Sequence, residues 1–309
     1  MDNNINDNLM HLDDTPIENN KNNVNLNTDS NKVYSCTNCN VKFISNNNIC
    51  FNCGNVCEST NDEFNFDEFM YIIPFEKSIN DLELDFMSKI RKNILLPFSL
   101  RNKNIINDVK KVYIPVILRN VNVNGKISFF AADSDIVKKN SKEYVKYEVG
   151  KTINIDYENI VYFLSSKFKD EYLSIVNNYD FNNMSLFDEN LLHNSDSYFI
   201  FPDLTDINPK IENDINKYSI GMVRDSITHD LKKVKENNIV HNCLLEKKFL
   251  LPCYLLKKVI NGKEYFYLMN GQNGLSIFNY SICTINIVII SVIIFILIFL
   301  ISFGLSYLL

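Results

Sequence analysis

The sequence predicts an α+β protein with three folded parts: an N-terminal four-cysteine zinc ribbon, an α+β domain with two similar antiparallel β-hairpins, and a C-terminal transmembrane helix. Three observations support this prediction. Two C-x2-C pairs stand close together near the N-terminus. Helix-like and strand-like patterns mix through the middle of the chain, where Asn-Gly pairs separate apolar runs. A long uncharged apolar stretch ends the sequence.

The composition excludes several classes of protein. The 309 residues include 31 Lys and Arg against 37 Asp and Glu, which gives a formal net charge of −6, and 46% of them are hydrophobic. A chain this apolar is not disordered throughout, and it is long enough for one or two cored domains. With only 8 Gly and 7 Pro it is not collagen-like. Its acidity argues against a general nucleic-acid coat.

Residues 1–32 form an Asn-rich segment in which acidic residues outnumber bases and no apolar run occurs. Such a segment buries too little apolar surface to offset its ordering entropy, so we predict a disordered tail. It has neither the basic nor the apolar region of a secretory signal, and no export signal is expected. We attribute the high asparagine content of the whole chain to a biased coding composition.

A zinc site is predicted from Cys36, Cys39, Cys50 and Cys53 within a ribbon at residues 33–58. Each C-x2-C turn directs two thiolates at one ion, and two such turns complete the tetrahedral shell that Zn²⁺ prefers. Disulfides require an oxidising compartment, and an iron–sulfur cluster usually has another spacing. A closed four-thiolate site stabilises a fold and does not catalyse. We interpret the fifth cysteine, Cys57, as a spare thiol beside the site.

Nucleic-acid binding by the ribbon is not expected. Its only basic residues are Lys32 and Lys42, whereas phosphate contacts need a basic stripe. Residues 59–69 are acidic and polar and are predicted to be a linker.

An α+β domain is predicted over residues 70–280. Ser78 and Asp81 fit a capping box, and apolar residues recur after them at helical spacing, so Ser78–Asn93 is an amphipathic helix. We also predict a strand pair across Gly150, a short strand at Tyr198–Phe201 and a long helix over Ile215–Lys235. A turn at residues 269–274 leads into a last short strand.

Two segments within this domain are similar. Lys111–Phe130 matches Lys248–Tyr267 without a gap, including one proline and one Asn-Gly pair in each. Asn-Gly between β-rich runs is a strong hairpin signal, so we predict two equivalent hairpins with turns at Asn124-Gly125 and Asn261-Gly262. Each proline is expected at a strand start or an edge. Convergence on a common hairpin pattern is the alternative explanation.

Residues 282–306 are predicted to cross a membrane as a single helix. The stretch Ile287–Leu305 is almost wholly apolar, and about 20 such residues span a bilayer. Eight lysines against four acids lie in Asp230–Glu264, and no charged residue follows Glu264. The positive-inside rule therefore predicts a tail-anchored cell-membrane protein with its N-terminal domains in the cytoplasm. The same lysines either contact anionic headgroups or form a solvated face.

Catalytic motifs are hard to find. Ser226, His229 and Asp230 are neighbours in sequence but lack the other parts of a catalytic triad. His241 and Cys243 are too few to hold a metal ion. The sequence contains neither a P-loop nor a dinucleotide-binding glycine pattern. We expect no catalytic residues and no cofactor beyond a structural zinc ion.

The order of the motifs resembles that of the uncharacterised bacterial zinc-ribbon membrane proteins, whose ribbon is described as of the transcription-factor-IIB type. The motifs are the cysteine pairs, Ile73-Pro74-Phe75, Tyr113-Ile114-Pro115, Tyr179-Asp180-Phe181, Leu251-Pro252-Cys253-Tyr254-Leu255-Leu256 and Asn270-Gly271-Gln272-Asn273-Gly274. The resemblance covers roughly residues 33–309. The chain departs from the family in having Asn40 where the first knuckle usually has glycine, and in having no tryptophan. The resemblance implies no reaction.

These observations favour a membrane-anchored, non-enzymatic protein that binds or scaffolds another protein on the cytoplasmic side. A membrane-tethered nucleic-acid-binding or transcription-linked ribbon protein is the first alternative. An enzyme with an unrecognised site in the α+β domain is the second.

Overall fold

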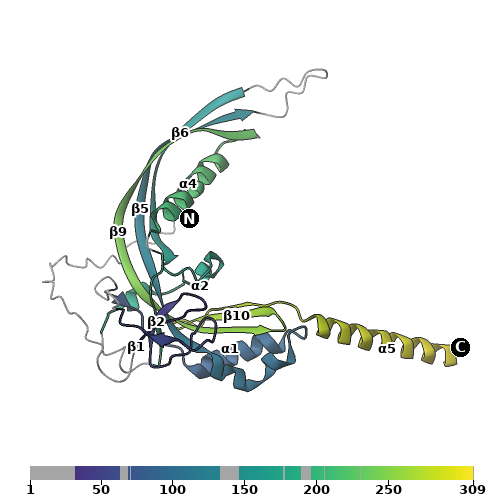
Figure 1. The fold of residues 1–309 in the computed structure, drawn as a ribbon. Helices are drawn as coiled ribbons and strands as arrows, with labels where there is room; N and C mark the ends of the chain where they lie inside the picture. Colours follow the sequence, from purple (N-terminus) through teal and green to yellow (C-terminus); the bar gives the residue numbers. More distant parts are fainter. Residues whose placement is uncertain are drawn as a thin grey trace, which may run out of the picture.

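A computed structural model of the chain describes residues 32–62, 69, 71–132, 146–176, 178–188, 196–204, 206–229 and 231–308. The predicted tail lies outside the described residues except for Lys32, and so does most of the predicted linker. The described chain is mixed α+β and consists mostly of sheet. One C-terminal helix projects away from the rest of the molecule (Figure 1).

Eleven strands of the described residues form one sheet with the order β11-β10-β9-β5-β8-β2-β1-β3; β6 also pairs with β5, and β4 with β7 and β9. The strands are β1 (Lys32–Ser35), β2 (Lys42–Ser45), β3 (Glu58–Ser59), β4 (Tyr71–Ile72), β5 (Lys110–Ala132), β6 (Lys146–Phe163), β7 (Ser185–Leu186), β8 (Tyr198–Ile200), β9 (Leu231–Ile260), β10 (Lys263–Asn270) and β11 (Ser276–Asn279). The α-helices are α1 (Ile79–Arg91), α2 (Leu173–Val176), α4 (Asn208–Asp225) and α5 (Thr284–Leu308). The 3₁₀ turns are η2 (Phe98–Arg101), η3 (Lys103–Asp108), η4 (Asp170–Tyr172) and η5 (Phe181–Asn183).

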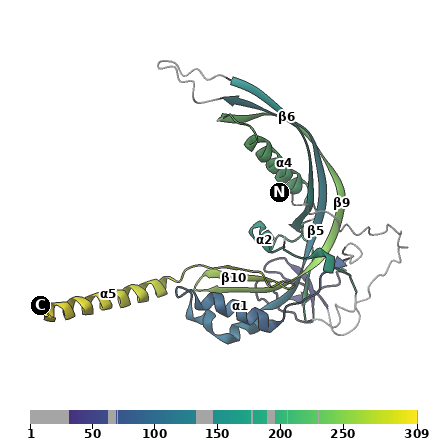
Figure 2. The ribbon, with the colours of Figure 1, turned by 180° about the vertical axis from the view of Figure 1, so that it is seen from behind.

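The strands β6, β5 and β9 form a long curved arm, and α4 lies on its concave face (Figures 1 and 2). Bulges bend both ladders of β5: near Asn120 in its pairing with both neighbours, and near Ser128 in its pairing with β9. Apolar side chains join α4 to the arm: Ile211 and Ile215 pack with Val121 and Val123. We give the name "arm" to these three strands.

The first of the two predicted hairpins is wrong. The chain does not turn at Asn124-Gly125, because β5 runs straight through both residues to Ala132. Gly125 has φ +141°, and a Cβ atom there would lie 2.2 Å from the Asn238 carbonyl oxygen and 2.7 Å from the Ile239 Cα atom. The glycine is needed for the close approach of β9 to β5 and not for a turn.

The chain does turn at Asn261-Gly262, between β9 and β10. Ile260 and Lys263 are register partners, so the loop has two residues. Asn261 and Gly262 have φ values of +53° and +72°, which match the right-handed twist of the strands they join. The same dipeptide therefore has different roles in the two similar segments.

A local two-fold relation connects those segments in space. Ile114 of β5 pairs with Leu251 of β9, and the gapless alignment places the same two residues opposite one another. β8 runs parallel to β5, and β4 runs parallel to β9. The order strand, helix, long strand, partner strand occurs twice, as β4-α1-β5-β6 and as β8-α4-β9-β10. Each unit therefore places its first short strand on the long strand of the other unit.

Both prolines lie inside long strands, and not at a strand start or an edge as expected. β5 pairs with β8 before Pro115 and with β6 after it. β9 pairs with β4 before Pro252 and with β10 after it. Each proline thus stands where a strand changes its neighbour, and its missing N–H costs the ladder no hydrogen bond.

Two other predictions of local structure are wrong because the segments pair with the distant strand β5. The strand pair predicted across Gly150 is one strand, β6, which pairs with β5 on both sides of that glycine. The helix predicted over Ile215–Lys235 ends at Asp225, and the residues from Leu231 onward belong to β9. In both cases, pairing with the distant β5 outweighs the local pattern.

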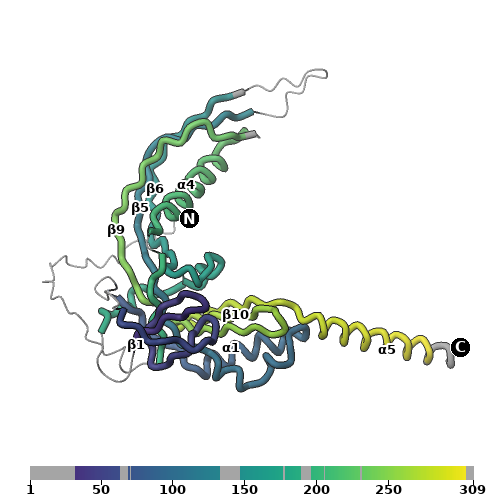
Figure 3. The backbone as a smooth tube through the Cα atoms, viewed as in Figure 1, coloured from purple at the N-terminus to yellow at the C-terminus, as the bar shows by residue number. Residues whose placement is uncertain are grey.

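The remaining elements cover the base of the sheet. The capping box of Ser78 and Asp81 begins α1 as predicted, and Leu82, Phe86 and Ile90 are buried. They pack against β9 and β10, while Tyr172 stacks on Phe266 from the opposite face at 4.4 Å between ring centroids. The cysteine-bearing segment lies where the arm meets this base (Figure 3). It joins the same sheet, because β2 pairs with β8.

We predict opposite effects for two glycine substitutions. Gly125→Ala should lower the free energy of unfolding by about 2 kcal/mol or more, because the new Cβ atom meets backbone and φ stays positive. Gly221→Ala, in α4, meets nothing within 4 Å and should raise it by about 0.5–1 kcal/mol. Chemical unfolding of the full chain in detergent, followed by circular dichroism, measures both. A neutral Gly125→Ala would contradict the close packing of β5 on β9.

Candidate metal centre

The four cysteines lie on two turns with the same backbone pattern. The Asn40 N–H donates to the Cys36 carbonyl at 2.8 Å, and the Gly54 N–H donates to the Cys50 carbonyl at 2.9 Å. Asn40 and Gly54 both have positive φ, at +54° and +77°. Asparagine tolerates this conformation better than other residues with a side chain, which explains how the first knuckle closes without glycine.

The four thiols meet at one point. The Sγ atoms of Cys36 and Cys53 are 3.4 Å apart, those of Cys39 and Cys50 are 3.6 Å apart, and all four lie within 4.8 Å of one another. A tetrahedral ion with metal–sulfur bonds near 2.3 Å places its ligands about 3.8 Å apart. The donor set and its spacing therefore fit a tetrahedral metal ion with little rearrangement.

Burial and hydrogen bonds change the pKa values of the cysteine thiols in different directions. Burial raises the pKa of Cys36, but backbone N–H groups of Cys39 and Asn38 outweigh it and lower that pKa to about 6. Burial dominates at Cys50 and raises its pKa far above the usual range. Burial also raises the pKa of Cys39. Because a metal ion binds thiolates, its uptake releases the protons that Cys39 and Cys50 hold.

Cys57 lies beside the four thiols but outside their cluster. Its side chain is buried, and its Sγ atom donates to the Asn55 carbonyl at 3.6 Å. Burial, with the neighbouring Cys36 and Cys53 thiols, raises its pKa to about 11. Its Sγ atom is not one of the four that lie within 4.8 Å of one another, so Cys57 is a neighbour of the cluster and not a member of it.

The cysteine cluster shares its core with the sheet. Phe43 from β2 and Phe51 from the second knuckle contact the ring of Tyr198 in β8, with centroids 5.4 and 6.0 Å apart. The Lys257 ammonium of β9 also donates to the Asn52 side chain at 3.2 Å. A metal ion here would hold together a segment that packs on two strands of the main sheet.

The other candidate groups do not gather into a site. The Ser226 hydroxyl donates to the Val223 carbonyl and accepts from Lys151, and the His229 ring stacks on Tyr147. Asp230 lies outside the described residues. Within the described part of the chain, no second group of three or more possible metal ligands gathers, so His241 and Cys243 remain apart from any such set.

α5 is the one helix among the described residues that is long and apolar enough to cross a membrane. Almost none of Thr284–Phe303 is buried against the rest of the chain. Its first turn is nevertheless attached: the Asn286 amide donates to the carbonyls of Ile94 and Leu96 at 3.2 and 2.6 Å. The polar side chain of Asn286, at the start of an apolar run, therefore attaches the helix to the segment that follows α1.

Comparison with known proteins gives one informative match. The chain is 21% identical over 211 residues to the uncharacterized protein YdjG of Bacillus subtilis (strain 168). The match covers 66% of this chain and 61% of that protein, so it spans about three fifths of the relative's length. No family model and no solved structure matches the chain.

Two serine substitutions distinguish a ligand from its neighbour. We expect full-length chain to contain one metal ion, Cys50→Ser to lose it, and Cys57→Ser to keep it, because only Cys50 belongs to the four-thiol cluster. Elemental analysis of the purified chains measures this. Cys50→Ser should also lower the free energy of unfolding by about 2 kcal/mol or more. Loss of metal from Cys57→Ser would show that Cys57 is a ligand.

Proposed function

We propose that the chain is a membrane-anchored zinc-ribbon protein whose folded domain faces the cytoplasm and binds another protein without catalysing a reaction. The observation that carries the proposal is that one chain combines a four-thiol site, an extended sheet and an apolar helix. The resemblance of its motif order to that of the bacterial zinc-ribbon membrane proteins supports the proposal. The YdjG match has no stated function to transfer.

Zinc is the metal that the donor set favours. Four thiolates in tetrahedral positions suit Zn²⁺, and a site with no ligand position left open has a structural role. The ribbon strand β2 pairs with β8, so the ion would stabilise the end of the sheet that β2, β1 and β3 form.

The arm supports a role in binding protein. None of the described strands pairs with the outer edge of β9 from Leu231 to Lys248. Val240 and Leu244 are exposed along this stretch. An open strand edge can accept an extended segment of a partner, while its lysines prevent indiscriminate pairing.

Membrane orientation can be measured with the native cysteines. Cys243 is exposed on the arm, whereas the other cysteines are buried or belong to the cluster. We expect a membrane-impermeant maleimide to label Cys243 only after cells that produce the full chain are lysed. Cys243→Ser is the control and should remove the label. Labelling in intact cells would place the arm outside and contradict the cytoplasmic orientation.

Site-specific crosslinking tests the binding role. A benzophenone amino acid at Leu244, on the open edge of β9, should give a discrete protein adduct in cells. The same probe at Leu84, which is also exposed and lies on α1, should give none. The adduct should also form when membranes are irradiated in high salt, and nuclease should leave it unchanged, since strand addition depends on backbone hydrogen bonds. An adduct that nuclease removes would instead favour the nucleic-acid alternative.

A further inference from the structure

The attachment of α5 fixes one end of the sheet domain at the membrane. The Cys283 N–H donates to the Leu95 carbonyl at 3.0 Å, in addition to the two hydrogen bonds of Asn286. The apolar run begins at Ile287, one residue later. The backbone of residues 94–96 therefore lies within about one helical turn, about 5 Å, of the hydrocarbon boundary.

A second segment lies on the other side of the same helix turn. The Lys263 ammonium donates to the Ile282 carbonyl at 2.6 Å and to the Thr284 hydroxyl at 3.1 Å. Lys263 directly follows the Asn261-Gly262 turn, so the tip of the β9–β10 hairpin is also held at the base of α5. We call residues 91–104 and 258–263 together the juxtamembrane face.

Large apolar side chains on this face point to solvent. The exposed fractions are 60% for Ile94, 65% for Phe98 and 66% for Val259. Ile94 belongs to the stretch that receives the hydrogen bonds of Asn286, so its side chain cannot be far from the lipid. Aromatic and aliphatic groups at this depth gain free energy by entering the headgroup region.

The charge of the face is opposite to that of the whole chain. Its two segments contain six bases and no acid, although the chain has a net charge of −6. The bases are Arg91, Lys92, Arg101, Lys103, Lys258 and Lys263. Asp108 pairs with Lys258 and Glu83 pairs with Lys103, which still leaves an excess of positive charge. Such a face complements an anionic bilayer surface.

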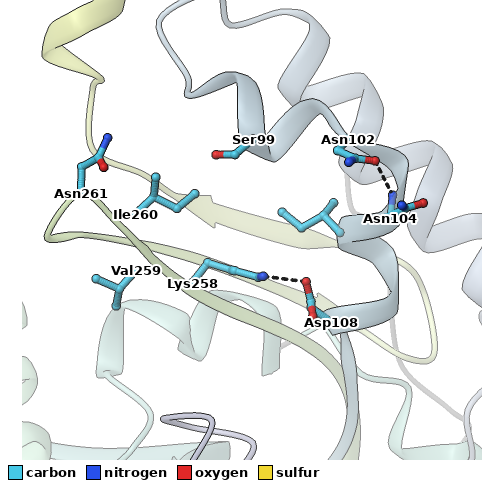
Figure 4. Close-up of a pocket in the computed structure, with 9 residues that line it drawn as sticks. Ser99, Asn102, Asn104, Asp108, Lys258, Val259, Ile260 and Asn261 are labelled. Atoms are coloured by element: carbon cyan, nitrogen blue, oxygen red, sulfur yellow. Dashed lines mark hydrogen bonds and ion pairs between the residues drawn. The ribbon is translucent and has the colours of Figure 1, made fainter.

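A cavity of about 510 Å³, lined by both polar and apolar side chains, opens between the two segments (Figure 4). Ser99, Asn102 and Asn104 line one side of it, and Asn261 lies across from them. The ion pair of Lys258 and Asp108 also lines the cavity. Asn261 also borders the first turn of α5, together with Thr284 and Ile285. Hydroxyl and amide groups at this position are suited to the phosphate and hydroxyl groups of a lipid headgroup.

We propose that the juxtamembrane face binds the bilayer surface directly, with Ile94, Phe98 and Val259 inserted among the lipids and the basic residues selecting anionic phospholipid headgroups. This rests on the proposed membrane anchoring through α5. It adds a second contact, which holds the sheet domain in one orientation to the bilayer.

The absence of tryptophan from the chain permits a direct test, because each introduced tryptophan is the only one. Full chains with Phe98→Trp, Phe299→Trp or Tyr218→Trp are reconstituted in nanodiscs whose lipids are brominated near the headgroup end of the acyl chains. Phe299 lies in α5 and Tyr218 in α4, and both are exposed. Phe98→Trp keeps an aromatic ring beside the Arg101 guanidinium, which lies 5.0 Å from it.

Bromine should quench most of the emission of Phe98→Trp and Phe299→Trp and leave that of Tyr218→Trp unchanged. If Phe299→Trp is not quenched, α5 is not in the bilayer and the proposed anchoring fails. If Phe299→Trp is quenched and Phe98→Trp is not, the anchoring stands and the contact proposed for the juxtamembrane face is overturned.

Lipid selection is tested with brominated phosphatidylglycerol or brominated phosphatidylcholine at equal mole fraction in unlabelled phosphatidylcholine. Phosphatidylglycerol should quench Phe98→Trp more strongly, and Lys92→Gln with Lys103→Gln should remove the difference. Lys217→Gln, an exposed position on α4, is the matched control and should preserve it. Equal quenching by the two lipids would overturn the selection of anionic headgroups.

Discussion

The pairing of β5 with β9 is the interaction on which the rest of the structure depends. The two strands pair from Lys110 to Ala132 on one side and from Leu255 to Leu231 on the other. Every other strand of the described residues joins the sheet through one of them, directly or through a series of neighbouring strands. Because this ladder is so long, Gly125 has to leave room for the backbone of β9, and the bulges have to bend both strands together.

The cysteine segment and α5 are attached to different parts of this framework. The first joins through β2 and β8 and through the aromatic contacts of Tyr198. The second joins through Asn286, whose amide is buried against the loop after α1. A metal ion would stabilise the first part and a bilayer the second, and both would act through the same sheet.

Some local features were predictable because neighbouring residues determine them. The capping box of Ser78, the turn at residues 269–274 and the short strand at Tyr198 follow from side chains a few positions apart. The convergence of four thiols follows from two repeated C-x2-C turns. The abundant asparagine also proves to have local uses, since Asn40, Asn159 and Asn261 all adopt positive φ.

The sequence by itself therefore determined the cysteine cluster, the first helix, and the presence of an apolar C-terminal helix, because each depends on spacing along one short segment. Only the tertiary structure decided whether Asn-Gly forms a turn. At Asn261 the strand has no further partner and the chain reverses, whereas at Asn124 the distant strands β6 and β9 offer hydrogen bonds on both sides and β5 continues. Those partners lie from about 30 to more than 100 residues away in sequence, so no local pattern encodes them.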